Sequence, residues 1–509
     1  MALTAARGEM PEARLEAGSD AALAPTRERL LAELSSEQSK GAISLIVLTG
    51  IVRAVESALI AISGIAPYSL YVAPGQGYEP SIFIAVPAIA ALSIVILQAL
   101  QTYSLTAFRQ PVEQFFRVAG GWSLAFLIVF AALFLLKLDG ALSRVWIVSW
   151  YVLGLGALGA ERTMLSRLCR KLARSGRLDR RAVVVGGGEF GSELLRELAQ
   201  ADIDEVRTLG VFDDRSNNRA PETVEGFPKL GNVDDLVEFA RRTRIDLVIF
   251  ALPITAEERI LQMLRKLWVL PIDIRLAAHA NRLRFRPRSY SYVAKAPMLD
   301  LFDKPIADWD VVIKLAFDKV VGALALLALS PVLAATAIAI KLTTRGPVLF
   351  RQRRYGFNNE LIEVFKFRSM YVDQVDANAA RLVTRDDPRV TRVGRFIRRT
   401  SIDELPQLIN VVFKGNLSLV GPRPHALHAK AANRHYDEVV DGYFARHRVR
   451  PGITGWAQVN GWRGETDTQE KLQHRVEHDL YYIENWSILL DLYILAITPA
   501  SLLKSQNAY

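Results

Sequence analysis

The feature that most constrains this chain is a series of four apolar stretches in its first third, each close to the length of a bilayer-spanning helix. The stretches cover residues 41–65, 80–107, 119–138 and 143–160. A helix that crosses a bilayer needs about 20 mainly apolar residues. We therefore predict a four-helix transmembrane module over 41–160, after a polar tail at 1–40. Within the first stretch, Arg53 and Glu56 are expected to form an ion pair that faces the bundle.

Basic residues around these stretches predict the orientation of the module. Residues 54–108 contain neither Lys nor Arg, whereas Arg109 and Arg117 lie between the second and third stretches. A basic run follows the fourth stretch and includes Arg162, Arg167, Arg170, Lys171, Arg174, Arg177, Arg180 and Arg181. Cytoplasmic loops of membrane proteins carry an excess of Lys and Arg. The N-terminus, a basic linker at 161–180 and everything after it are therefore expected on the cytoplasmic side.

Net charge and cysteine content limit the chemistry outside the membrane. Lys and Arg total 63 and Asp and Glu total 53, so the formal net charge is +10. A basic surface suits an anionic partner, and phospholipid headgroups, sugar nucleotides and nucleic acid all qualify. Cys169 is the single cysteine, which excludes an internal disulfide and a cysteine metal cage. The soluble parts fit a reducing compartment better than an oxidising one.

After the basic linker the pattern becomes that of a nucleotide-binding fold. A strand over 182–185 is followed by a glycine-rich turn and by a helix over 192–199. Gly186, Gly188 and Gly191 match G-x-G-x-x-G in this strand–turn–helix context. Further strands are expected at 208–212, 247–252 and 272–276, with helices at 233–242 and 256–268.

These elements predict a Rossmann-like α/β domain with an open, doubly wound sheet over 181–290. Asp213 and Asp214 end the second strand, where a ribose-binding acid would lie. The glycines indicate nucleotide binding, or they merely permit a tight turn. Because no constellation of His, Lys or Tyr for hydride transfer is evident, a regulatory or structural module is favoured over an active oxidoreductase.

A second apolar segment lies far from the first module and contains a helix breaker. Residues 320–340 are mostly apolar and would span about 30 Å as one straight helix. Pro331 interrupts the helical hydrogen bonds near the middle. Cations flank both ends, namely Lys314, Lys319, Lys341 and Arg345. We therefore predict a re-entrant membrane helix over 310–345, with a kinked fifth crossing as the alternative.

Residues suited to catalysis follow in the soluble region 346–509. Two adjacent carboxylates, Asp403 and Glu404, stand among cations in the run 398–407. Apolar residues at helical spacing predict a helix with Asp403 as its N-cap and Gly415 as its stop. A capping role alone explains Asp403. A carboxylate held ionised among arginines also suits a nucleophile or a ligand of Mg²⁺.

Nucleic-acid binding is another explanation for the basic residues before this pair. No recognition motif or series of stacking aromatic residues accompanies them, and the chain is expected to be held in a membrane. Arginine also suits bidentate contacts to phosphate. We therefore expect diphosphates and polar-lipid headgroups as partners, and no nucleic acid.

Several motifs together resemble the bacterial sugar transferase family, the monotopic polyprenol-phosphate hexose-1-phosphate transferases. The motifs are Lys366–Met370, Asp403–Gln407, Gly421–Pro424 and Arg450–Gly461. Further along, Trp462–Thr468 and Asp479–Ser487 resemble the long-form subgroup of undecaprenyl-phosphate glucose phosphotransferases, which initiate exopolysaccharides. The resemblance implies a phosphoglycosyl transferase whose α-rich α/β catalytic domain occupies 346–509.

The resemblance also implies a two-step exchange. Asp403 would attack the β-phosphate of a UDP-sugar, release UMP and carry the sugar phosphate covalently until undecaprenyl phosphate takes it. Glu404 would assist catalysis, and Asp403, Glu404 and Asp479 would hold Mg²⁺. The sequence leaves the hexose open between glucose and galactose, and the subgroup favours glucose.

Further residues and the location follow from the same resemblance. Candidate phosphate and substrate contacts are Lys366, Arg368, Arg399, Arg423, Arg450 and Arg463. Ser330 and Pro331 match the kink of the family's re-entrant helix. The protein is expected in the bacterial inner membrane, with several spans, a cytoplasmic catalytic domain and a homodimeric assembly. The competing hypothesis is a membrane scaffold or regulator whose nucleotide-fold module senses a ligand.

Overall fold

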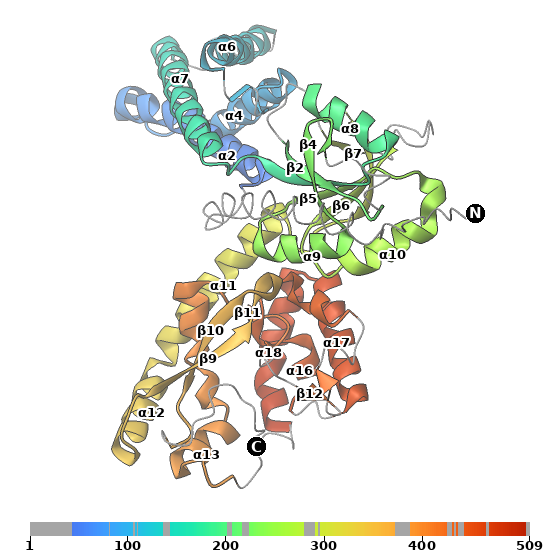
Figure 1. Ribbon diagram of the computed structural model, residues 1–509. Helices are drawn as coiled ribbons and strands as arrows, with labels where there is room; N and C mark the ends of the chain where they lie inside the picture. The colour runs from blue at the N-terminus through green and yellow to red at the C-terminus, as the bar shows by residue number, and fades with distance from the viewer. Residues whose placement is uncertain are drawn as a thin grey trace, which may run out of the picture. The chain divides into compact units, whose positions relative to one another are not determined.

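The computed structural model describes most of the chain between residues 43 and 504 and divides it into two compact units (Figure 1). One unit centres on residues 36–181 and the other on 182–200 and 208–509. Within 43–504, the residues not described are 81, 105–106, 109, 136–142, 201–205, 216–222, 279–290, 294–295, 372–386, 425–429, 432–433, 436–441 and 465–467. The polar tail expected at 1–40 lies outside the described residues.

Long helices pack together in the first unit. They are α2 (Leu45–Pro67), α4 (Ile82–Ala99), α6 (Pro111–Leu135) and α7 (Arg144–Arg174), with the π turn η1 (Tyr68–Val72) and the short α3 (Ala73–Gln76) after α2. Trp122, Trp146 and Trp150 are buried in their core, and each indole N–H donates to a backbone carbonyl at 2.8–3.0 Å. Gly64 and Gly154 allow this packing, since a Cβ at either position would lie 2.5 Å from an indole carbon.

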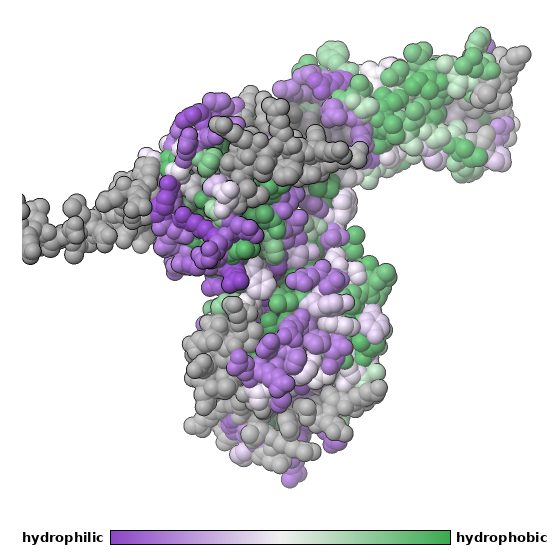
Figure 2. Space-filling model, turned by 90° about the vertical axis from the view of Figure 1, so that its right-hand side faces the viewer, coloured by the Kyte–Doolittle hydropathy of each residue, from purple (hydrophilic) through white to green (hydrophobic). Residues whose placement is uncertain are grey.

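Three of these helices have the properties of bilayer spans, and the prediction of four is confirmed only in part. In the described part of the chain, Leu45–Gly75, Ile82–Ala99 and Val112–Leu135 are long and apolar enough to cross a membrane. α7 is not among them, because Trp, Tyr, Ser and Gly residues interrupt its apolar half and its second half is basic. Large apolar side chains are exposed on the unit's outer surface, part of the green surface in Figure 2. Such a surface suits contact with lipid.

The buried ion pair of this unit differs from the predicted one. Glu56 pairs with Arg162 of α7, and their side chains are 0% and 1% exposed. The hydroxyl of Tyr103 also donates to Glu56, at 2.5 Å. Arg53 instead lies over the Tyr103 ring, 4.8 Å from its centroid. The predicted pairing of Arg53 with Glu56 is wrong because α2 packs against α7, so that a neighbouring helix supplies the partner.

The second unit begins with a mixed α/β sheet. In the described residues its strand order is β3-β4-β2-β1-β5-β6-β8-β7. The strands are β1 (Arg180–Val185), β2 (Val206–Phe212), β3 (Thr223–Val224), β4 (Phe227–Gly231), β5 (Leu247–Phe250), β6 (Asp273–Ala277), β7 (Ser291–Val293) and β8 (Ala296–Phe302). The pairs β2–β4, β1–β5 and β5–β6 are parallel, whereas β7 and β8 add an antiparallel edge. Between the strands lie α8 (Glu189–Gln200), α9 (Val233–Arg242), the 3₁₀ turn η2 (Ile254–Ala256) and α10 (Glu257–Leu267). The predicted α/β domain is present, but its sheet extends past the expected boundary at 290.

The glycine-rich turn after β1 is tightly packed. Gly186 has φ of +104°, a conformation that favours glycine. A Cβ at Gly191 would lie 2.0 Å from the carbonyl oxygen of Gly186, so the residue's lack of a side chain allows α8 to approach β1. Asp213, after β2, accepts a hydrogen bond from the N–H of Gly187 at 2.7 Å and pairs with Arg215 at 2.6 Å. Asp213, one of the two acids expected at the ribose, is thus engaged by the protein itself.

A bent helix pair connects the sheet to the rest of the unit. α11 (Asp308–Ala328) and α12 (Ser330–Thr343) meet at an angle of 58°. Pro331 lies in the first turn of α12, where its missing N–H is tolerated. The hydroxyl of Ser330 donates to the carbonyl of Leu327 at 2.7 Å. The break predicted at Ser330 and Pro331 is confirmed.

The remaining residues form an α-rich α/β region. Its strands are β9 (Leu349–Tyr355), β10 (Leu361–Phe367), β11 (Ser418–Val420), β12 (Lys430–Ala431), β13 (Arg434–His435) and β14 (Gly452–Thr454). Its α-helices are α13 (Arg392–Arg399), α14 (Gln407–Ile409), α16 (Trp456–Val459), α17 (Gln469–Glu484) and α18 (Ile488–Lys504). Its 3₁₀ and π segments are η5 (Phe357–Asn359), η7 (Ile402–Glu404), η8 (Asn410–Lys414) and η9 (Tyr443–Arg448). β9 and β10 form a hairpin, and β11 pairs with β14 in parallel. One apolar core joins β10, β11, α14, α17 and α18 and includes Val364, Leu408, Leu419, Tyr482 and Ile494.

Candidate active site

Glu404 is the centre of a compact charged cluster. Lys366 of β10 places its ammonium 2.9 Å from Oε1 of Glu404, and the guanidinium of Arg423 donates to the same oxygen. The side chain of Glu404 is 12% exposed, against 19% for Lys366 and 26% for Arg423. The carboxylate therefore binds two cations in a largely buried place, where charged hydrogen bonds are strong.

A residue with left-handed backbone leads the chain into the carboxylate pair. Ser401 lies between α13 and η7 with φ of +59°, and Arg463 donates to its hydroxyl. The predicted N-cap role of Asp403 is wrong. The turn η7 begins at Ile402 after Ser401, and no side chain caps it. The predicted stop at Gly415 is confirmed, since this residue ends η8 with φ of +66°.

Different surroundings shift the pKa values of the two adjacent carboxyls in opposite directions. Burial and the charge of Glu404 raise the pKa of Asp403 to about 6, although Lys366, Arg398 and Arg423 oppose this. Burial also acts to raise the pKa of Glu404, but the charges and hydrogen bonds of Arg423 and Lys366 outweigh it and hold this pKa well below its usual range. Glu404 stays ionised while Asp403 titrates close to neutral pH, an arrangement typical of carboxyls with different chemical tasks.

The other predicted anion contacts divide into near and distant residues. Arg463 lies close enough for the charges of both carboxylates to act on it. Arg399 and Arg450 are exposed, and neither makes a hydrogen bond or ion pair through its side chain to another described residue. Arg398 is the cation of α13 whose charge acts on Asp403. Sequence reasoning chose Arg399 instead, because adjacent helix positions point about 100° apart and the helix phase was not fixed.

Comparison with known proteins relates this cluster to a family. The family model of bacterial sugar transferases matches residues 309–505, and the model of a CoA-binding domain matches residues 98–278. A UDP-glucose:undecaprenyl-phosphate glucose-1-phosphate transferase of Xanthomonas campestris pv. campestris is 31% identical over 464 residues, which are 90% of this chain and 94% of the relative. The chain belongs to the bacterial sugar transferase family.

Two further relatives of this sugar transferase have similar names. An undecaprenyl-phosphate glucose phosphotransferase of Komagataeibacter xylinus is 40% identical over 371 residues, or 71% of this chain and 66% of the relative. A UDP-glucose:undecaprenyl-phosphate glucose-1-phosphate transferase of Escherichia coli (strain K12) is 38% identical over 366 residues, or 72% of this chain and 76% of the relative. The chain thus spans slightly less than two thirds of the first relative and most of the second.

Arg368 of this sugar transferase binds the end of a helix and lies apart from the charged cluster. Arg368 is 4% exposed. The guanidinium donates to the carbonyl of Arg345 at 2.8 Å, and to the carbonyl and hydroxyl of Thr344 at 3.0 and 2.7 Å. These oxygens lie just after α12, where a helix leaves carbonyls in need of donors. The donors of Arg368 face these oxygens, which argues against the predicted contact of Arg368 with phosphate.

Asp479 is not gathered with the other two predicted metal ligands. Its carboxylate pairs with Arg446 at 2.6 Å, and the two side chains are 2% and 0% exposed. Among the described residues, no three His, Cys, Asp or Glu side chains are grouped to hold a metal ion. Asp403 and Glu404 remain, and two carboxylates suffice for Mg²⁺ when substrate phosphates and water complete its shell. Magnesium at Asp403 and Glu404 stays a prediction for this sugar transferase.

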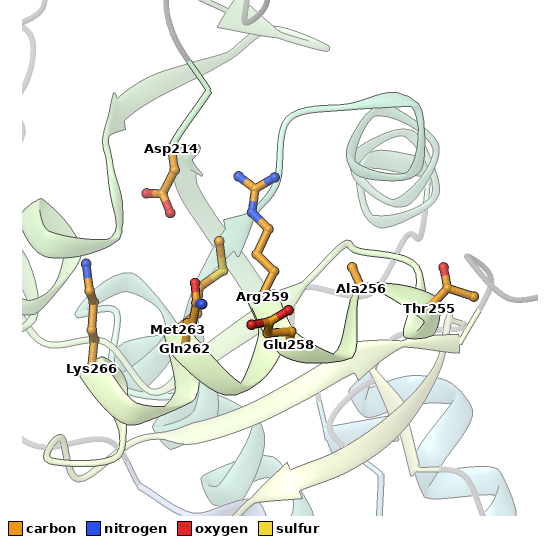
Figure 3. A pocket seen from close by; sticks show the side chains of 8 residues that line it. All are labelled: Asp214, Thr255, Ala256, Glu258, Arg259, Gln262, Met263 and Lys266. Carbon is orange, nitrogen blue, oxygen red and sulfur yellow. The ribbon is translucent and has the colours of Figure 1, made fainter.

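A separate cavity of about 650 Å³ lies in the α/β domain. Its walls are formed by Asp214, Thr255, Ala256, Glu258, Arg259, Gln262, Met263 and Lys266. Arg259 and Lys266 rise from α10 toward the side where Asp214 follows β2 (Figure 3). Ligands of open α/β sheets bind near the carboxyl ends of the strands. None of the residues of the charged cluster lines this cavity. A ligand held there would bind apart from the sugar transferase chemistry.

Proposed function

We propose that this sugar transferase moves glucose-1-phosphate from UDP-glucose to undecaprenyl phosphate and releases UMP. The observation that carries the proposal is the oppositely shifted carboxyl pair beside Lys366 and Arg423. Two cations suit a diphosphate, and a carboxyl with a pKa of about 6 is mostly ionised at neutral pH yet more basic than an ordinary aspartate. The names of the relatives support this donor and acceptor. Galactose-1-phosphate is the alternative cargo.

The proposed reaction consists of two displacements at phosphorus. A carboxylate oxygen of Asp403 attacks the β-phosphorus of UDP-glucose, and the bond from that phosphorus to the bridging oxygen breaks, so that UMP leaves with the electron pair. The glucose phosphate is now bound to Asp403 as an acyl phosphate. A phosphate oxygen of undecaprenyl phosphate attacks the same phosphorus, and the bond to Asp403 breaks to restore the carboxylate. The product is the lipid-linked sugar with which an exopolysaccharide begins.

The neighbouring residues have distinct roles in this proposal. Lys366 and Arg423 face the negative charge of the diphosphate, while Glu404 holds both cations in place. Mg²⁺, held by Asp403 and Glu404, would neutralise phosphate charge. Because Glu404 remains ionised beside its two cations, it keeps this geometry whether or not Asp403 carries a proton.

We further propose how the chain sits in the bacterial inner membrane. The long helices α2, α4, α6 and α7 form a transmembrane module, and the α/β domain is Rossmann-like. α11 and α12 enter and leave the membrane on one side, which the 58° bend and the cations at both ends support. The catalytic domain then faces the cytoplasm, where UDP-glucose is dissolved and the acceptor phosphate lies at the headgroup plane. A homodimer stays a prediction.

The experiment that tests the function is UMP release by the full-length protein in detergent with Mg²⁺ and undecaprenyl phosphate. UDP-glucose, UDP-galactose and UDP-N-acetylglucosamine are compared as donors. We expect release from UDP-glucose alone and a loss of at least about a thousandfold in Asp403→Asn. Asp234→Asn is the matched control, because this side chain is 70% exposed.

A labelling experiment without acceptor tests the covalent step. Radiolabelled glucose phosphate should stay on the wild-type protein and be absent from Asp403→Asn. Release of UMP from UDP-galactose alone would replace the proposed donor. If folded protein releases no UMP from any of the three donors, the transferase proposal fails and the scaffold hypothesis leads.

A further inference from the structure

A buried ion pair lies behind the charged cluster. Arg446 of η9 donates from Nη2 to Oδ2 of Asp479 in α17 at 2.6 Å. A charge removed from water is costly unless a partner compensates it, and such pairs often add little net stability. Their presence in an interior therefore calls for a role beyond stability.

The same nitrogen of Arg446 also donates to the carbonyl oxygen of Arg423 at 2.7 Å. The side chain of Arg423 in turn donates to Glu404. A continuous series of contacts thus runs from Asp479 through Arg446 and Arg423 to the carboxylate of Glu404. None of these contacts requires Asp479 to approach a substrate or metal.

The segment Gly421–Pro424 is held at each residue by a different partner. The N–H of Gly421 donates to Thr454 at 2.9 Å, and the carbonyl of Pro422 accepts from Gly452 at 3.0 Å. The carbonyl of Pro424 accepts from Arg354 at 3.2 Å. The carbonyl of Arg423 relies on Arg446. Two prolines also restrict the backbone of this segment. Loss of the Arg446 contact would therefore release the main chain of Arg423, whose side chain must stay in contact with Glu404.

We propose that Arg446 and Asp479 are positioning residues that fix the main chain of Arg423 and thereby hold its guanidinium against Glu404. Asp479 orients Arg446, and Arg446 orients Arg423. The role assigned to Asp479 differs from metal binding, and the effect on turnover rests on the proposed transferase function.

Asp479→Asn in the full-length protein is the first test. Asparagine keeps the size of the side chain but removes the charge that orients Arg446. We expect kcat for UMP release to fall about 10- to 100-fold, with the half-saturating Mg²⁺ concentration within about twofold of wild type. A rise in that concentration of more than about tenfold would make Asp479 a metal ligand and overturn the proposal.

A double variant separates positioning from general support of the fold. Arg446→Met with Asp479→Leu replaces the buried pair with apolar side chains, which often preserves stability. We expect a low kcat, since the carbonyl of Arg423 has lost its donor, and a thermal midpoint lowered only as far as the loss of that hydrogen bond and of the charge that faces Arg475 requires. If the double variant has the thermal midpoint and the kcat of wild type, the ion pair has only a structural role and the proposal is overturned. Arg446→Lys keeps one charged donor and should give an intermediate kcat.

A stability cycle tests the geometry without any turnover. The thermal midpoints of Asp479→Asn, Arg423→Met and their combination are compared with that of wild type. Residues in one contact series are not additive, so the combined shift should be smaller than the sum of the single shifts. Additive shifts would overturn the proposal even in a protein that releases UMP. Non-additive shifts in a protein that releases no UMP would support the positioning contacts and reject the transferase function alone.

Discussion

Asp403 and Glu404 are adjacent in the chain, yet their side chains meet different surroundings and so hold protons differently. Lys366 and Arg423 form ion pairs with Glu404 and keep it ionised. Burial of Asp403 and the charge of the adjacent Glu404 raise the pKa of Asp403. Neighbouring side chains therefore set the basicity of Asp403, the proposed nucleophile. A substitution beside Asp403 should change the pH dependence of the rate, in addition to any effect of the lost contact.

Acid should inactivate the enzyme at the pKa of Asp403. The protonated carboxyl cannot attack phosphorus, so kcat/KM for UMP release should fall about tenfold per pH unit below pH 6 and level off above pH 7. Lys366 lowers this pKa, so Lys366→Met should move the fall to higher pH. Rates between pH 5 and 8 check both expectations. A wild-type profile that stays flat to pH 5, or a shift to lower pH in the variant, would contradict them.

At the scale of elements, the proposed re-entry of α11 and α12 predicts that the outer ends of both helices face the cytoplasm. Cys169 is the single cysteine and is buried, so a Cys169→Ala background leaves introduced cysteines as unique labels. We expect Asp310→Cys and Thr343→Cys to react with an impermeant thiol reagent in inverted vesicles and to be protected in right-side-out vesicles. Asp234→Cys reports that the reagent reaches the cytoplasmic side. Labelling of the two helix ends from opposite sides would establish a kinked crossing instead.

The contacts of Arg368 predict an effect on folding without an effect on substrate binding. Arg368→Met removes three hydrogen bonds whose acceptors lie on the half-buried Thr344 and the exposed Arg345, at a cost of about 1–3 kcal/mol in the free energy of unfolding. KM for UDP-glucose should stay within about twofold of wild type. Thermal unfolding and UMP kinetics measure both, with exposed Arg395→Met as the control. A higher KM with unchanged unfolding would return Arg368 to the substrate site.

These elements also show how far sequence reasoning reaches. The glycine turn at Gly186–Gly191 and the break at Pro331 were predicted because both depend on local backbone preferences. The partners of Arg368 and Asp479 were not, because a main-chain carbonyl and a distant arginine leave no local pattern. Asp403 was misjudged as a cap for a related reason, since neither the left-handed backbone of Ser401 before it nor the contact of Ser401 with the distant Arg463 leaves a local pattern.

At the scale of the whole molecule, the glycine-rich turn of the α/β domain lies beside an acid that the protein itself already engages. Asp213 is engaged by Gly187 and Arg215, and these contacts hold the pKa of its carboxyl below its usual range although burial opposes them. We therefore expect NADH to bind the full-length protein with a Kd weaker than about 1 mM, as measured by isothermal titration. Saturable binding tighter than this would reopen the oxidoreductase hypothesis.

The hydrogen bonds between Arg368 and the end of α12 have a consequence for the position of the catalytic region relative to the membrane. Arg368 follows β10, two residues after Lys366, so the membrane helix and the strand that carries a catalytic cation are tied within one short stretch of chain. The depth to which the bent helices sink would then set the height of Lys366 above the lipid. If α11 and α12 re-enter the bilayer as proposed, the rate should therefore depend on acyl-chain length, because the bilayer would help to align the proposed sugar phosphate with the lipid that receives it.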